Sequence, residues 1–151
     1  MTNMVKGGKI NINNLGEDNM LKQKMRLTKS EKEVMDTFWE NEEGLTCTEL
    51  VEASTEKSWK KTSAHLLIRS LLAKGFLDVS GFKKTTKNYA RIFKAKMSFE
   101  DYMIEVIMAN STAEDRKQLI FKLIDEATLE ELEDMKKTID KYRLQLLYRK
   151  S

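Results

Sequence analysis

Four capping boxes divide much of this chain into helices. In a capping box, the hydroxyl of a helix-opening Ser or Thr accepts from the backbone N–H three residues on, and the acid there binds back to the first residue's N–H. The sequence has this pattern at Thr28–Glu31, Thr46–Glu49, Ser111–Glu114 and Thr128–Glu131. Each box opens a run of apolar residues at three- and four-residue steps, and the chain has no proline. The chain is therefore predicted to be mainly α-helical.

The N-terminal half is predicted to hold three helices, over 29–41, 47–55 and 60–74. In the third, Ala64, Ile68 and Leu71 lie on one apolar stripe, which we expect to be buried. Gly75 follows as a left-handed C-cap, because glycine adopts positive φ without steric cost.

Two short runs rich in β-branched and aromatic residues come next, over 76–79 and 89–93. They predict an antiparallel hairpin, with the basic segment 80–88 as a long tip. Three helices followed by such a hairpin, the wing, are typical of a winged helix-turn-helix.

The C-terminal part is predicted to be helical again, over 99–110, 112–126 and 129–148. The last helix carries apolar residues at a 3, 4, 3, 4 spacing, which is typical of a coiled-coil seam. These residues are Leu132, Met135, Ile139, Tyr142 and Leu146. No internal partner is large enough to cover them, so they predict a homodimer. The expected domains are a flexible tail (1–25), a winged-helix domain (26–95) and a helical dimerisation region (96–151).

The positive charge is concentrated in one segment of the chain. Residues 59–94 hold nine Lys or Arg and one acid, a net charge of +8, whereas 1–58 carry −3 and 95–151 carry −2. A basic block within a folded segment is the electrostatic pattern of a protein that binds a polyanion. Double-stranded DNA is therefore the predicted partner. The alternative is a winged helix that binds only protein, which would not require this charge.

The buried stripe of helix 60–74 determines which of its side chains point outward to the DNA. The candidate DNA-contacting residues of this helix are Lys60, Lys61, Thr62, Ser63, His65, Leu66 and Arg69. Arg69 is suited to bidentate recognition of guanine, while Leu66 and the Thr62 methyl group suit a thymine methyl group. On the hairpin the candidates are Lys83, Lys84, Thr85, Lys87, Tyr89 and Arg91. Those at its tip suit phosphate or minor-groove contact, which positions a protein without reading much sequence.

Other classes of protein find little support in the sequence. No apolar run approaches the roughly 20 residues that span a bilayer, and the N-terminus lacks a signal peptide's apolar core, so a cytoplasmic protein is expected. One cysteine, Cys47, and one histidine are too few for a dedicated zinc or copper site. No glycine-rich phosphate loop is present. We therefore expect no cofactor, no metal and no catalytic activity.

The assembled motifs resemble those of the penicillinase-repressor family of bacterial transcription repressors. The first helix is similar in Leu27, Thr28, Glu31, Val34, Met35 and Trp39. The recognition-helix region is similar in the spacing of Trp59, Leu67, Leu71 and Lys74-Gly75-Phe76, and Tyr89 fits a tyrosine on the second wing strand. The resemblance covers about residues 26–145.

The resemblance implies a homodimeric repressor that binds a palindromic operator and dimerises through its C-terminal helices. It also implies a membrane sensor protease as a further partner, since one branch of the family is cleaved near the start of those helices. The counterpart of the cleaved Asn-Phe pair is Asp101-Tyr102. The chain departs from the family at Lys60-Lys61, Leu66 and Ser70, where the family commonly has Ser-Pro, threonine and arginine. The C-terminal cysteine cluster of the copper-responsive branch is absent.

Overall fold

The computed structural model describes residues 26–150, so the predicted tail over 1–25 lies outside the described residues. Contacts divide the chain into two compact units, Met1–Ala109 and Asn110–Ser151, which are described separately below. The predicted domain boundary after residue 95 falls within the first unit, and as a functional boundary it stays a prediction.

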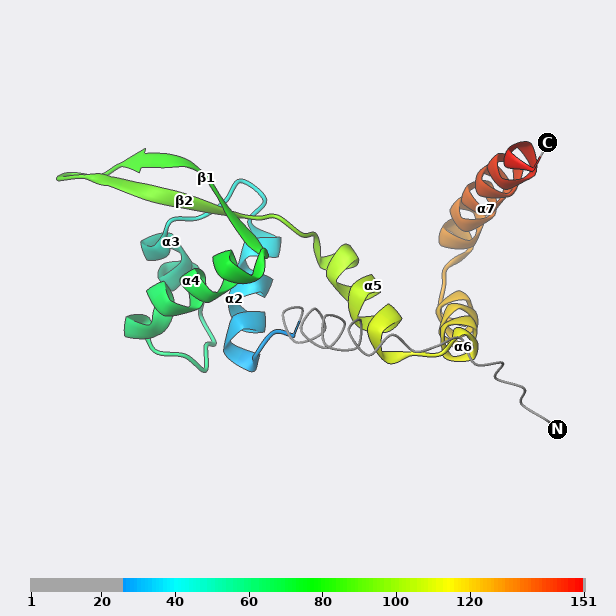
Figure 1. Ribbon diagram of the computed structural model, residues 1–151, viewed down its shortest axis with the longest axis horizontal. Helices are drawn as coiled ribbons and strands as arrows, with labels where there is room; N and C mark the ends of the chain where they lie inside the picture. The colour runs from blue at the N-terminus through cyan, green and yellow to red at the C-terminus, as the bar shows by residue number, and fades with distance from the viewer. Residues whose placement is uncertain (1–25, 151) are drawn as a thin grey trace, which may run out of the picture. The chain divides into compact units, whose positions relative to one another are not determined.

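Three helices form the body of the first unit: α2 (Lys29–Glu40), α3 (Cys47–Ala53) and α4 (Ala64–Lys74) (Figure 1). Both predicted capping boxes are present here. The Thr28 hydroxyl accepts from the Glu31 N–H at 3.2 Å, and the Glu31 carboxylate accepts from the Thr28 N–H at 2.9 Å. Thr46 and Glu49 make the same pair of bonds at the start of α3.

The helix predicted over 60–74 is divided into two parts. Its first turn is a 3-10 helix, η1 (Lys61–Ser63), and the α-helix begins at Ala64. This sequence has no Ser, Thr, Asp or Asn at the position before η1, and neither η1 nor α4 has a side-chain cap. The C-terminal end of α4 is as predicted. Gly75 adopts the left-handed conformation at φ 82°, and its N–H donates a hydrogen bond to the Leu72 carbonyl oxygen at 3.1 Å.

The hairpin consists of β1 (Leu77–Lys84) and β2 (Tyr89–Ala95), paired antiparallel with an irregularity between Val79 and Gly81. The predicted first strand was too short and the predicted tip too long. Lys83 and Lys84 lie in β1 opposite Ala90 and Tyr89, and only four residues separate the strands. Polar residues can continue a strand here because cross-strand backbone bonds do not depend on side-chain type.

A third short segment joins the sheet at its base, where Leu45 and Phe93 exchange two backbone hydrogen bonds of 2.9 Å each. Gly44 precedes this bridge at φ 89°, and a Cβ at that position would lie 2.6 Å from the Phe93 carbonyl oxygen. The close approach and the positive φ together require glycine. Leu45 thereby links the start of α3 to the hairpin.

One hydrophobic core joins these helices and the base of the hairpin. Its buried members are Val34, Met35, Phe38, Leu50, Trp59, Ala64, Ile68, Leu71, Phe76, Leu77 and Phe93. The predicted stripe of α4 is thus buried, and its opposite face is left exposed. In Figure 1 the far end of the hairpin extends past α3 and α4 as a wing. The fold is a winged helix-turn-helix.

Helix α5 (Phe99–Asn110) begins against this body through an aromatic cluster. The Trp39 ring lies 5.4 Å from Phe99 and 5.5 Å from Tyr102, and Tyr102 lies 5.8 Å from Phe76. The Trp39 Nε1–H also donates to the Met97 carbonyl oxygen at 2.8 Å. These contacts attach the start of α5 to the winged helix.

The second unit contains α6 (Ala113–Asp125) and α7 (Leu129–Arg149). The predicted box at Ser111–Glu114 was wrong by one residue, because Thr112 caps α6 and pairs with Asp115. The predicted Thr128–Glu131 box opens α7. Neither helix has a buried residue, so within the described part of the chain this unit has no core of its own. No helix among residues 26–150 is long and apolar enough to cross a membrane.

Candidate nucleic-acid interface

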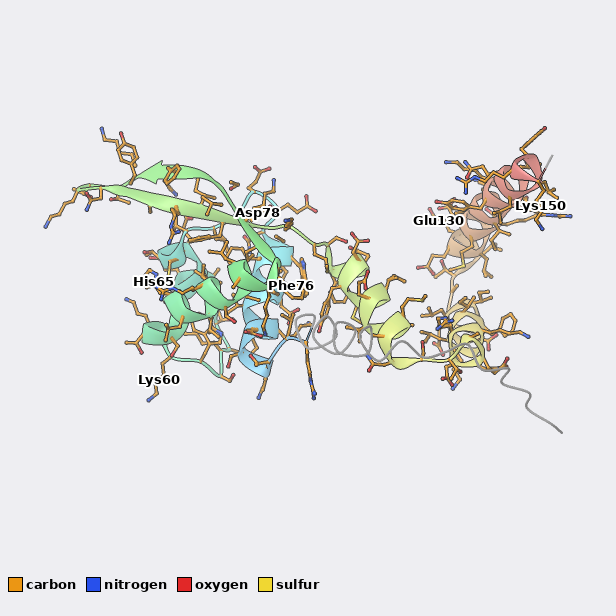
Figure 2. The ribbon with its side chains drawn as sticks, viewed as in Figure 1. Lys60, His65, Phe76, Asp78, Glu130 and Lys150 are labelled. Atoms are coloured by element: carbon orange, nitrogen blue, oxygen red, sulfur yellow. The ribbon has the colours of Figure 1, made fainter. Side chains whose placement is uncertain are left out.

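The outward face of η1 and α4 carries most of the predicted helix contacts. Lys60, Lys61, Thr62, His65, Leu66 and Arg69 are all exposed, and Ser63 is half-buried. Leu66 is an apolar side chain that is 64% exposed at the centre of this face. Figure 2 labels Lys60 and His65, which come from the N-terminal end of the face. Since η1 and α4 lack side-chain caps, their first N–H groups and the two lysines favour an anion at this end.

A buried carboxylate fixes the rotation of α4. Glu31, on α2, is only 4% exposed, and its carboxylate accepts from Ser70 Oγ at 2.6 Å and from Lys74 Nζ at 2.6 Å. Burial by itself would raise the pKa of Glu31. The hydrogen bonds from Lys74, Ser70 and Thr28 together have a larger effect, so the pKa lies below its ordinary value. Glu31 is thus held as an anion. Because Ser70 faces α2, the neighbouring Arg69 is turned to solvent.

The wing residues differ in how free they are to bind a ligand. Lys84, Lys87, Tyr89 and Arg91 are exposed, whereas Lys83 forms an ion pair with Glu49 of α3. The pKa of Glu49 is lowered, first by the hydrogen bond from Lys83 and second by the bond from the Thr46 backbone N–H. The Thr85 hydroxyl also has partners in the turn, since it donates to the Asn88 carbonyl at 2.7 Å. Lys83 and Thr85 are therefore less available for an external ligand than their neighbours.

Phe82 is a residue that the sequence reasoning missed. It is 66% exposed on β1, opposite Arg91 on β2. The sequence signal was an aromatic residue directly before Lys83 and Lys84, in a segment otherwise made of small, polar and basic residues. The sequence predicts a loop for that segment, and in a loop the face of a single aromatic residue is not defined.

The predicted dimerisation residues lie along α7. Leu132, Ile139, Tyr142 and Leu146 are exposed and Met135 is half-buried. A groove runs along the C-terminal half of this helix, lined by Thr138, Ile139, Tyr142, Arg143, Leu146, Leu147 and Lys150. Leu147 was not among the predicted residues because it lies outside the 3, 4 spacing. The apolar surface is therefore wider than the predicted seam.

The described residues offer little to a metal ion. No cluster of three His, Cys, Asp or Glu with suitable geometry occurs between residues 26 and 150. Cys47 is half-buried, and burial raises the pKa of its thiol. A raised pKa keeps a thiol protonated and less reactive.

These features define a class of protein: a winged helix-turn-helix with an exposed basic recognition helix and a basic wing. The penicillinase repressor family profile matches residues 27–141 of the sequence, and the chain belongs to that family. It is accordingly a DNA-binding transcriptional repressor, and the family consists of regulators rather than enzymes. No curated protein sequence matches the chain significantly.

The chain also aligns with solved structures of other regulators. MepR, a transcription regulator of the Staphylococcus aureus multidrug efflux pump MepA, is 14% identical, with 89% of this chain and 93% of that chain covered and a TM-score of 0.37. A mutant form of MepR is 17% identical, with 89% and 90% covered and a TM-score of 0.38. The adhesin competence repressor AdcR of Streptococcus pyogenes is 18% identical, with 89% and 94% covered and a TM-score of 0.34.

Proposed function

We propose that this protein represses transcription as a homodimer whose two winged helices bind the half-sites of a palindromic operator. The observation that carries the proposal is the exposed apolar surface of α7, in a unit whose helices bury no residue. Contiguous apolar surface of this kind usually marks an interface. A second copy would provide the missing core.

A dimer also gives the DNA-binding face a mechanism for selecting one site. Two-fold symmetry would present two recognition helices to half-sites about one helical turn apart, or a multiple of it. Because the two winged helices are linked, the second binds at a high effective concentration, which raises overall affinity well above that of one domain. The palindrome follows from the symmetry of the protein.

Within each half, we assign the contacts by their chemistry. Arg69 and Leu66 project from the middle of the α4 face and would read base edges in the major groove. Lys60 and Lys61, beside the uncapped N-terminus, would bind phosphate. On the wing, Lys84 and Lys87 would neutralise further phosphates, and Lys83 would do so only after leaving Glu49.

Regulation by a sensor protease is a separate proposal that rests on the family alone. The Asp101-Tyr102 bond lies within α5, and Tyr102 packs between Trp39 and Phe76. A protease needs an extended substrate strand in its active site, so cleavage here would require the first turns of α5 to unwind and leave the aromatic cluster. We place the protein in the cytoplasm, where its DNA target is.

Sedimentation of the full-length protein and its Ile139→Asp variant tests the proposal. The wild type should sediment as a dimer at micromolar concentration, and the variant should be monomeric, because a charge would enter the seam. Leu144→Asp is a matched control, since it places the same charge on an exposed apolar residue of α7 that belongs neither to the seam nor to the groove. A monomeric wild type would refute the symmetric mechanism. A wild-type dimer that binds no duplex DNA at low salt would favour the protein-interaction alternative.

A further inference from the structure

The wing has two faces with different surroundings. In an antiparallel pair, residues directly opposite one another share a face, and the faces alternate along each strand. Pairing places Lys83 opposite Ala90 on one face and Gly81 opposite Ile92 on the same side. Gly81, Ala90 and Ile92 are half-buried, and Lys83 is bound to Glu49. This face is therefore partly covered by the protein itself.

The other face is open and combines aromatic with cationic side chains. Pairing places Phe82 opposite Arg91 and Lys84 opposite Tyr89. All four are exposed, Phe82 by 66% and Tyr89 by 69%. Each aromatic residue therefore has a cationic residue directly opposite it on the neighbouring strand. At the base of the face, the Arg91 guanidinium lies 5.3 Å from the centre of the Phe93 ring, which is buried in the core.

Solubility alone does not explain this composition. A lysine-rich hairpin end remains soluble without large apolar rings, and an exposed aromatic residue on a strand exposes the protein to aggregation. Cations beside the rings favour a ligand that is negatively charged and also offers an apolar surface. Duplex DNA has both properties, since phosphates border the sugar and base edges of its grooves. The face is also continuous with the turn that carries Lys87, within the +8 segment.

We propose that the face formed by Phe82, Lys84, Tyr89 and Arg91 reads the DNA minor groove. Phe82 and Tyr89 contact the sugars and base edges, and Lys84 and Arg91 bind the phosphates on the two sides. This inference rests on the proposed DNA-binding function and adds to it an aromatic contact and a defined reading surface. The minor groove is only about 6 Å wide, so side chains that project from the face would enter it while the hairpin backbone stays outside. Apolar side chains can enter it and partly unstack a base step.

Aromatic contact in the minor groove has a consequence for sequence preference. The minor groove distinguishes A·T from G·C chiefly through the 2-amino group of guanine, which projects into it. An aromatic ring pressed against the floor of the groove would be obstructed by that group. The protein should therefore prefer A·T pairs where the wing lies, next to each recognition-helix contact.

The experiment uses duplexes selected from a randomised library by the full-length protein. Hydroxyl-radical footprinting identifies the flank that the wing protects. In this flank, A·T pairs are replaced either by G·C pairs or by inosine·cytosine pairs. An inosine·cytosine pair has the minor-groove groups of A·T and the major-groove groups of G·C. The wild type should tolerate inosine·cytosine and lose affinity on G·C. Phe82→Ala should bind the selected duplex roughly 10-fold more weakly, within the range for aromatic–base contacts, and should no longer distinguish the two replacements.

Val79→Ala is the matched control, because it shortens another exposed apolar side chain of β1 that lies opposite Phe93 at the base of the hairpin and is not one of the four proposed contacts. It should bind like the wild type. If inosine·cytosine is as harmful as G·C, or if Phe82→Ala changes only the sedimentation of the protein, the minor-groove assignment is wrong. If Phe82→Ala binds normally while Arg69→Ala does not, this inference fails and the proposed function stands. If the wild type selects no duplex, the proposed function itself fails.

Discussion

Lys74 donates to the buried carboxylate of Glu31 at 2.6 Å, across 43 residues of sequence, and so connects the end of α4 to the start of α2. The same carboxylate caps α2 and accepts from Ser70. One side chain therefore starts the first helix and sets the rotation of the recognition helix. A substitution here affects both the stability of the domain and the orientation of its DNA-binding face.

Replacing Lys74 by methionine should lower the free energy of unfolding by about 1–3 kcal/mol, because Glu31 would remain buried with one bond fewer to a charged partner. Urea unfolding followed by circular dichroism measures this change. Lys94→Met is the control, since Lys94 is exposed on β2 and should change stability little. Equal effects of the two variants would show that the ion pair contributes nothing specific.

The stability of the domain should depend on pH through Glu31. Its pKa in the folded protein lies below the ordinary value of 4.5, so the ionised form stabilises the fold above that value. This contribution should be lost as the pH falls from 4.5 through the lowered pKa. Urea midpoints at a series of pH values should show a drop below 4.5 that is smaller in Glu31→Gln. An identical drop in the variant would assign the pH dependence to other carboxylates.

Arg69→Ala and Lys84→Ala should separate reading of sequence from positioning. Arg69→Ala should cost roughly 1–3 kcal/mol on the operator and relax discrimination at one base pair. Lys84→Ala should weaken binding to operator and random DNA alike and lower the salt slope by about one. Titrations at several salt concentrations measure both effects. If the two variants behave identically, the assignment of the outward face of α4 is wrong.

Glu49→Gln should strengthen binding to random duplex DNA at low salt. The change keeps a capping side chain for α3 while releasing Lys83 and removing one negative charge. The expected gain is about 0.2–1 kcal/mol, as for an exposed ion pair. Fluorescence anisotropy of a labelled duplex measures it, and Lys83→Ala, Glu49→Gln together should abolish the gain. A gain that persists in the double variant would reflect the lost negative charge alone.

A fragment of residues 26–109 should fold as a monomer and bind the operator far more weakly than the full chain. A fragment ending at residue 96 should be less stable by at least about 2 kcal/mol, because Trp39 would lose its bond to Met97 and its contacts with Phe99 and Tyr102. Thermal unfolding compares the two fragments. Equal stability would mean that α5 contributes nothing to the winged helix.

Much of the fold could be predicted because its signals are local. The capping bonds of Thr28 and Thr128 join residues three apart, and the turn at Gly75 depends on the φ of a single residue. The spacing of Ala64, Ile68 and Leu71 likewise defines one face of a helix wherever that helix packs. The helix starts marked by Thr28, Thr46 and Thr128, and the outward side of α4, therefore followed from the sequence alone.

Only the tertiary structure decided which charges and rings are free. Nothing near Lys83 in the sequence indicates Glu49, which lies 34 residues away, or shows that Phe82 lies on the opposite face of a strand. The continuation of β1 through Ser80–Lys84 likewise depends on pairing with β2, because its own residues resemble a loop. Side-chain type determines local hydrogen bonding and periodicity, whereas the partner of a charge depends on which distant surfaces the packed core brings together.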